Sequence, residues 1–306
     1  MPRITIKQDD QKQRRAVSDA QKIFIMHCKL KNLAPYTIKY YEENLNFFQK
    51  SNRLIKNVDE ITQEVIDGYA SMLMTKGDRI TAINARLRAI FVFLRFCFNK
   101  GWAESYPLSQ LKEDEYAKEP YSEAELKKLL ERPTSGIWSE WRSWAAINLL
   151  VATGIRASTV VNIKICDVDF EHGILHLRKL KNRKQQTLPI SSSLADALSH
   201  YLELWDWNPE DFLFAGIHKE QLQPHSLESS IRRYNLSRGI TKTSVHLFRH
   251  TFAKSYILAG GGMVQLQAIL GHSTLDMTRK YINLYGNDIQ RDFDRLNPLN
   301  HIMSQS

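Results

Sequence analysis

The sequence predicts a mainly helical protein whose helical first half precedes a mixed α+β second half with a small antiparallel sheet. From about residue 16 to residue 110, apolar residues recur at helical spacing. Later, the stretch "VDFEHGILHLRKLKNRKQQTLPI" reads as strand, turn, strand, basic turn and strand. The charged stretch "LKEDEYAKEP" between the halves suggests a linker. We therefore expect a tail at 1–15, a first domain at 16–112, a linker at 113–121 and a second domain at 122–306.

Two helices of the first half show clear apolar stripes. The segment "TIKYYEENLNFFQ" aligns Ile38, Tyr41, Leu45 and Phe48. The segment "ITAINARLRAIFVFLRFCF" aligns Ile83, Leu87, Ile90, Leu94 and Cys97. A different face of the second helix carries Asn84, Arg88 and Arg95, which suits a DNA-facing edge, although solvated arginines on an amphipathic helix are the commoner case.

The second half begins with a helix at "YSEAELKKLL", where Ser122 and Glu125 form a capping box. The turn between its last two strands is crowded with Arg178, Lys179, Lys181, Arg183 and Lys184. These cations indicate either a solvated hairpin tip or phosphate contacts. The acidic stretch "DVDFEHG" before them lacks the glycine and glutamate that a calcium loop needs, so it predicts polar strand ends.

Composition is consistent with a globular protein and a polyanionic partner. The 306 residues are 43% apolar and 25% charged, with a net charge of +9. Residues 1–118 carry +6 of this charge and the remainder +3, so both halves are basic. Cys28, Cys97 and Cys166 fit no disulfide or metal spacing. No apolar signal core or membrane span is visible, so we expect a cytoplasmic protein without a membrane partner.

Two motifs near the end suggest chemistry. In "SVHLFRHTFA", His246, Arg249 and His250 lie close together on one helix face, as expected for an anion site. The order and position of this motif do not fit the phosphate loop of histidine phosphatases. In "LGHSTLDMTRKYI", His272 lies between two helices and Tyr281 lies about two turns into the second. Alone, that tyrosine is more typical of a core residue.

Taken in order, "ATGIRASTVVNI", the lysine hairpin, "HLFRH", "LGH" and the tyrosine resemble the tyrosine recombinase (phage integrase) family, of the two-domain Xer-like type. The resemblance implies a SAM-like core-binding domain followed by the tyrosine recombinase catalytic fold. It assigns the catalytic roles to Arg156, Lys181, His246, Arg249, His272 and Tyr281. Lys181 is chosen over Lys184 because it lies eight residues before Pro189. Thr159 stands where the family usually has a glutamate.

The resemblance implies a site-specific recombinase that cuts and rejoins DNA through a 3′-phosphotyrosyl intermediate, with no metal ion and no cofactor. It also implies double-stranded DNA carrying a recombination site, a homo-tetramer on DNA, a free monomer, and an accessory or partner recombinase. We expect DNA contacts from Asn84, Arg88, Arg95, Arg178, Lys179, Arg183 and Lys184. A terminal helix or tail from residue 286 would dock on its own domain or on a neighbouring subunit. A type IB topoisomerase and a catalytically silent DNA-binding regulator remain alternatives.

Overall fold

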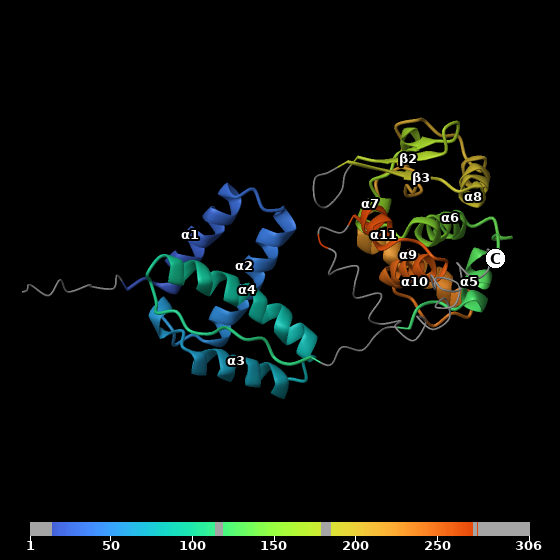
Figure 1. Cartoon of the computed structure of the whole chain (residues 1–306). Helices are drawn as coiled ribbons and strands as arrows, with labels where there is room; N and C mark the ends of the chain where they lie inside the picture. The colour runs from blue at the N-terminus through green and yellow to red at the C-terminus, as the bar shows by residue number, and fades with distance from the viewer. Residues whose placement is uncertain (1–13, 114–118, 179–184, 272–273, 275–306) are drawn as a thin grey trace, which may run out of the picture. The chain divides into compact units, whose positions relative to one another are not determined.

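The computed structural model describes residues 14–113, 119–178, 185–271 and 274. The chain divides into two compact units, Met1–Tyr116 and Ala117–Ser306, each with its own hydrophobic core (Figure 1). The point of division lies inside the stretch 113–121 that we interpret as a linker, and the exact domain bounds stay a prediction. In the part of the chain that the structure describes, no helix is long and apolar enough to cross a membrane.

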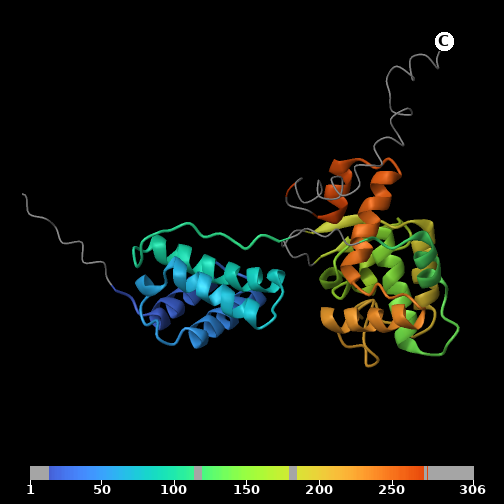
Figure 2. The same ribbon diagram turned by 90° about the horizontal axis from the view of Figure 1, so that it is seen from below.

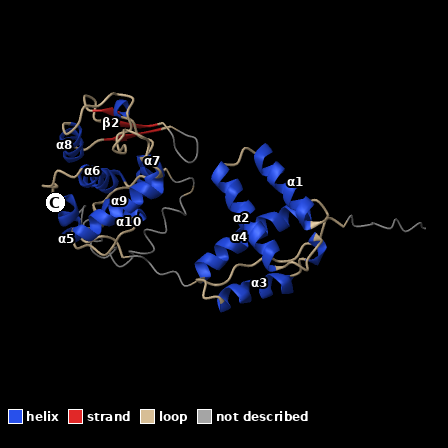
Figure 3. Cartoon of the chain, turned by 180° about the vertical axis from the view of Figure 1, so that it is seen from behind, coloured by secondary structure: helices blue, strands red, loops and turns tan. Residues whose placement is uncertain are grey.

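The described part of the first unit is built from helices (Figure 3). They are α1 (Val17–Leu30), α2 (Pro35–Ser51), the 3-10 turn η1 (Val58–Glu60), α3 (Gln63–Thr75) and α4 (Ile80–Asn99). Pro35 occupies the first turn of α2, where its missing N–H costs nothing. Helices α1, α2 and α3 all pack against α4. The predicted apolar stripe of α4 is confirmed, because its five residues are at most 1% exposed.

Helix α6 (Trp138–Thr153) lies at the centre of the second unit (Figures 1 and 2). It is buried on most of its circumference, as expected for a helix enclosed by others. Its neighbours are α5 (Glu123–Leu130), α8 (Ser192–Leu202), α9 (Pro224–Ser237) and α10 (Val245–Leu258). The short helix α7 (Ala157–Val160) follows α6, and α11 (Met263–Leu270) packs against α10. The capping box predicted at the start of α5 is present.

The sheet of the second unit has three antiparallel strands in the order β1, β2, β3 (Figure 3). They are β1 (Val168–Asp169), β2 (Ile174–Leu177) and β3 (Gln186–Pro189), and the short 3-10 turn η2 (Ile165–Asp167) leads into them. In the register of the last two strands, Leu175 pairs with Leu188 and Leu177 with Gln186. The leucines at these positions are buried against the helical core. The predicted fold class, mainly helical with a small antiparallel sheet, is confirmed.

Candidate active site

Arg249 is a buried arginine whose guanidinium joins the ends of two helices. Its side chain projects from α10 and the residue is only 6% exposed. Nη1 donates a hydrogen bond to the Gly154 carbonyl at 2.9 Å, and Nη2 donates to the Leu270 carbonyl at 2.8 Å. Both acceptors end a helix, where carbonyls lack intrahelical partners and carry partial negative charge. A buried guanidinium is therefore held in place by main-chain dipoles.

Gly154 shapes the turn that brings the first arginine to this point. It ends α6 in the left-handed conformation, with φ of 62°. A Cβ at this position would lie 2.6 Å from the Phe252 ring and 2.9 Å from a Leu270 methyl group. Both the left-handed backbone conformation and the close approach of these side chains require glycine at this position. Gly154 therefore allows the chain to turn sharply after α6. Two residues on, half-buried Arg156 is the N-cap residue of α7.

Arg156 and Arg249 line one small hollow in the second unit. The residues that line it come from α7, β2, β3, α10 and α11, with the turns beside them: Ile155, Arg156, Thr159, Leu177, Gln186, Arg249, Ile269, Leu270 and Gly271. The charged side chains among these residues are the two arginines, and no carboxylate belongs to the set. Thr159, at the position of the family's usual glutamate, is 6% exposed and faces this hollow. The hollow is therefore suited to an anion.

His246 lies in the first turn of α10, one turn before Arg249. It is exposed, whereas Arg249 is buried and His250 is half-buried. The helix that the motif "SVHLFRHTFA" predicts is confirmed. Sequence spacing alone did not indicate which of the three side chains would be buried.

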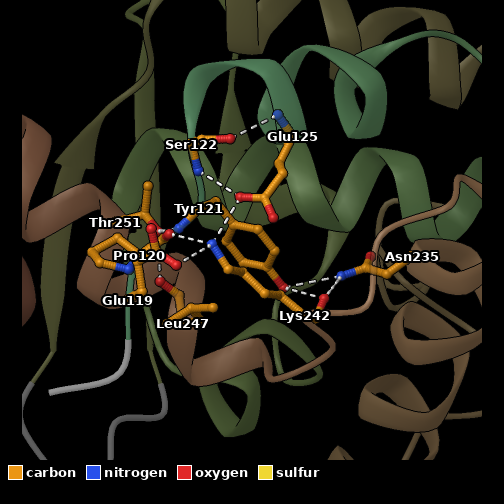
Figure 4. A network of polar contacts seen from close by, with 9 residues as sticks. All are labelled: Glu119, Pro120, Tyr121, Ser122, Glu125, Asn235, Lys242, Leu247 and Thr251. Carbon is orange, nitrogen blue, oxygen red and sulfur yellow. Dashed lines mark hydrogen bonds and ion pairs between the residues drawn. The ribbon is translucent and has the colours of Figure 1, made fainter. Parts of the chain in front are cut away.

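A polar network fastens the start of the second unit to α10 (Figure 4). The Tyr121 N–H donates to the Thr251 hydroxyl at 3.0 Å, and that hydroxyl donates to the Leu247 carbonyl at 2.8 Å. The Tyr121 ring stacks on Phe248 with centroids 4.4 Å apart. Its hydroxyl donates to the Lys242 carbonyl at 3.0 Å. Residues on either side of Arg249 are thus held by a segment more than a hundred positions earlier in the chain.

Lys242 extends this network to α5 (Figure 4). Its ammonium group donates to the Pro120 carbonyl at 2.9 Å and to the Glu125 carboxylate at 3.0 Å. Burial, the largest single influence, raises the pKa of Glu125, but hydrogen bonds from Ser122 and Lys242 outweigh it and the pKa is lowered. The Glu125 carboxylate therefore stays ionised and remains bound to Lys242, which lies on the loop before α10.

Three of the six predicted catalytic residues, Lys181, His272 and Tyr281, lie outside the described residues, as do Lys179, Arg183 and Lys184 and the tail from 286. Two described residues close to Lys181 and His272 in the chain, Gln186 and Gly271, line the arginine hollow. Arg178, at the end of β2, forms an ion pair with the buried carboxylate of Asp167 while most of its side chain stays exposed. The structure thus brings Arg156 and Arg249 together, with β3 and the end of α11 beside them.

Asn84 does not lie on the exposed face that we predicted for DNA contact. It is 2% exposed, and its Nδ2 donates to the Leu111 carbonyl at 2.8 Å and to Glu113 at 2.5 Å. Its Oδ1 accepts the Leu111 N–H at 2.9 Å. The prediction is wrong for this residue because the segment after α4 folds back and uses the whole side-chain amide. The spacing of residues within one helix could not predict a contact with a segment 27 positions away.

Arg88 and Arg95 are exposed on α4, as predicted. They border a groove of about 670 Å³ in the first unit. The residues that line it are Tyr40, Tyr41, Arg88, Phe91, Val92, Arg95, Leu108 and Gln110. Sequence reasoning missed Tyr40 and Gln110, although the doubled tyrosine in "TIKYYEENLNFF" was a signal. A groove with cations and aromatic rings is suited to a nucleic acid backbone.

Comparison with known proteins gives the family of the chain. The phage integrase family model matches residues 121–287, more than half of the chain. The tyrosine recombinase XerA of Pyrococcus furiosus is 28% identical over 289 residues, covering 94% of this chain and 96% of its own. The Tn1549 transposon integrase bound to transposon right end DNA has a TM-score of 0.74 at 20% identity, covering 87% of this chain and 94% of that one. A lambda integrase tetramer bound to a Holliday junction has a TM-score of 0.69 at 15% identity, covering 88% and 78%.

The two solved structures show a shared fold, and the family match extends to the site. The chain belongs to the phage integrase family. Its class is that of the tyrosine recombinases, enzymes that cleave DNA strands and rejoin them.

Proposed function

We propose that this chain is a site-specific DNA recombinase that cuts a strand with Tyr281 and rejoins it through a 3′-phosphotyrosyl intermediate. The observation that carries the proposal is the pairing of buried Arg249 with Arg156 in one hollow that has no carboxylate among its described lining residues. Two fork-shaped guanidiniums match the charge and the oxygen geometry of a phosphodiester. Hydrogen bonds to the Gly154 and Leu270 carbonyls fix the position of the Arg249 guanidinium beside Arg156.

The arginines would stabilise the transition state. As the tyrosine attacks, negative charge grows on the non-bridging phosphate oxygens, and preorganised donors act most strongly on such developing charge. Exposed His246, one turn before Arg249, would donate to the same oxygens or act as a general acid or base. We assign His272, which follows Gly271, a similar part.

The bond changes are balanced within protein and DNA. The Tyr281 oxygen forms a bond to phosphorus and the phosphorus–O5′ bond breaks, which leaves a free 5′ hydroxyl. Lys181 would give its proton to the departing 5′ oxygen. A free tyrosine has a pKa of about 10, so the cations that bind the phosphate would have to help it to ionise. Because the new bond is still a phosphodiester, another 5′ hydroxyl can attack it and rejoin the strand without a nucleotide cofactor.

Both units would grip the DNA. The first would use Arg88 and Arg95 beside the α4 groove, and the second would use Arg178 and the hairpin cations Lys179, Arg183 and Lys184. Two similar structures, an integrase bound to transposon end DNA and an integrase tetramer bound to a Holliday junction, support a DNA partner and tetrameric assembly. We propose that this chain also binds DNA and assembles as a tetramer on it, starting from a free monomer in the cytoplasm. An accessory protein or a partner recombinase would take part in the assembly.

A covalent trapping assay tests the proposal. The full chain is incubated in excess EDTA with a supercoiled plasmid library carrying the DNA that flanks its gene, and adducts are separated on a denaturing gel. We expect a covalent adduct and exchanged strands from the wild type. Tyr281→Phe should bind the same DNA without forming an adduct. The junctions of the trapped DNA identify the cleavage site.

The alternatives predict different products in that assay. Relaxed plasmid without strand exchange would indicate a type IB topoisomerase, and binding without any adduct would indicate a silent regulator. An adduct that persists in Tyr281→Phe would contradict the choice of nucleophile. Cleavage that stops with EDTA and returns with Mg²⁺ would contradict the metal-independent mechanism.

A further inference from the structure

Gln186, at the start of β3, makes two hydrogen bonds to a different element of the second unit. Its Nε2 donates to the Ala268 carbonyl at 2.6 Å and to the Ile269 carbonyl at 2.9 Å. These carbonyls belong to the last turn of α11, where they have few intrahelical partners. Both partners are carbonyl oxygens, which only accept hydrogen bonds, so the end of the Gln186 amide that faces them is its NH2 group. Gln186 therefore connects the sheet to the end of α11.

The same turn of α11 receives the buried arginine. Arg249 donates to the Leu270 carbonyl, so three successive carbonyls accept from two side chains of different elements. A Cβ on Gly271 would lie 3.3 Å from the Gln186 Oε1, which shows how closely the amide approaches the turn before His272. Arg156, Arg249 and Gln186 line the same hollow. The amide is thus part of the frame of the arginine pair.

Gln186 also stands at the base of the basic hairpin. It pairs with Leu177 in the sheet register, and Lys181 is five residues earlier in the chain. Helix α11 has other supports, because Leu266 and Leu270 are buried and Leu270 also accepts from Arg249. The contacts of Gln186 add to these supports and connect the start of β3, which follows the segment with Lys181, to the end of α11.

We propose that Gln186 is a positioning residue that fastens the base of the Lys181 hairpin to the last turn of α11. The proposal rests on the proposed function, in which Lys181 protonates the 5′ leaving oxygen. Gln186 does not touch the reacting atoms in this scheme. It limits the sideways movement of the strand that follows the general acid, and small displacements of a catalytic group cost rate.

The first test compares Gln186→Ala with Gln185→Ala in the full chain. Gln185 precedes it and is exposed, so the pair differs in the contacts with α11. The probe is an oligonucleotide duplex bearing the site mapped with the wild-type protein. For Gln186→Ala we expect single-turnover cleavage to fall by up to roughly 10²-fold, the cost of a small misplacement of a catalytic group, with DNA affinity unchanged. Gln185→Ala should cleave at the wild-type rate.

The second test asks whether the lost rate belongs to leaving-group protonation. A duplex with sulfur in place of the 5′ bridging oxygen releases a thiolate, which needs little proton donation. Gln186→Ala should recover most of its rate on this substrate, as Lys181→Ala should. A merely structural defect would persist on both substrates. Gln186→Met keeps the side-chain length and adds no charge but loses the two donors, so it should be impaired like Gln186→Ala and be rescued by sulfur.

The outcomes separate this inference from the proposed function. If the wild type forms no adduct, or if sulfur does not rescue Lys181→Ala, the proposed function or its lysine assignment fails. If both behave as expected but Gln186→Ala matches Gln185→Ala, the positioning role is overturned. A wild-type rate for Gln186→Met would also overturn it, because shape and not hydrogen-bond donation would then matter. Circular dichroism melts on all variants, with rates measured well below the melting range, confirm that each is folded.

Discussion

Arg249 in the second unit and Arg88 and Arg95 in the first unit are arginines on amphipathic helices, but their settings differ. Arg249 is 6% exposed and hydrogen-bonded to carbonyls that end α6 and α11. Arg88 and Arg95 are exposed beside an open groove. A buried guanidinium with fixed partners is preorganised for one phosphate, whereas exposed arginines supply charge that many phosphates can share. We therefore propose that burial separates an arginine that serves chemistry from arginines that serve affinity.

The largest expected effect comes from removing the buried arginine. Arg249→Ala should lower single-turnover cleavage by roughly 10²–10³-fold, the usual cost of one preorganised donor. It should also lower the free energy of unfolding by about 1–3 kcal/mol, because buried carbonyls lose their donor. Arg156→Ala, which removes a half-buried arginine, should match the rate loss with a smaller change in stability. Near-normal cleavage by either variant would remove the arginine pair from the mechanism.

The next effect concerns Asn84, which shares helix α4 with the exposed arginines but is buried. Asn84→Ala removes the hydrogen bonds that hold Leu111 and Glu113, so the unfolding free energy should fall by about 1–3 kcal/mol. Denaturant unfolding measures this change, and the exposed Asn99→Ala on the same helix is the control. The salt dependence of DNA binding should stay the same. If Asn84→Ala instead reduced the slope of log affinity against log salt and left stability unchanged, Asn84 would be a DNA-contacting residue after all.

Smaller effects are expected from the exposed arginines. Arg88→Ala and Arg95→Ala should each reduce the slope of log affinity against log salt by about 0.9, as for one lost phosphate contact. Cleavage at saturating protein should not change, because neither residue belongs to the arginine hollow. Affinity titrations at several salt concentrations measure the slope. If either variant cleaved more slowly at saturating protein, the exposed arginines would contribute to the cleavage step as well as to DNA affinity.

The sequence predicted the local features of both units well. Helical stripes, the capping box at Ser122 and the three strands all follow from short-range patterns. The order of the motifs also identified the family. Contacts between distant segments were not predictable, such as Asn84 with Leu111, Gln186 with α11, and Arg249 with Gly154. Single-sequence patterns report which face of an element is apolar, but not which carbonyl from another element will meet a polar side chain.

The smallest expected effect tests the network in which Lys242, on the loop before α10, contacts Pro120 and Glu125. The pKa of Glu125 is lowered in the folded chain, since hydrogen bonds from Ser122 and Lys242 outweigh the opposing effect of burial. A lowered carboxyl pKa contributes stability that is present above the unfolded pKa of about 4.3 and is lost as pH falls through the folded pKa. Glu125→Gln should therefore be less stable than the wild type near neutral pH, and the difference should shrink below about pH 4. Glu123→Gln, in the same first turn of α5 but exposed, controls for the helix dipole. Unfolding curves at several pH values measure the difference, and an offset that does not change with pH would exclude the ion pair as its source.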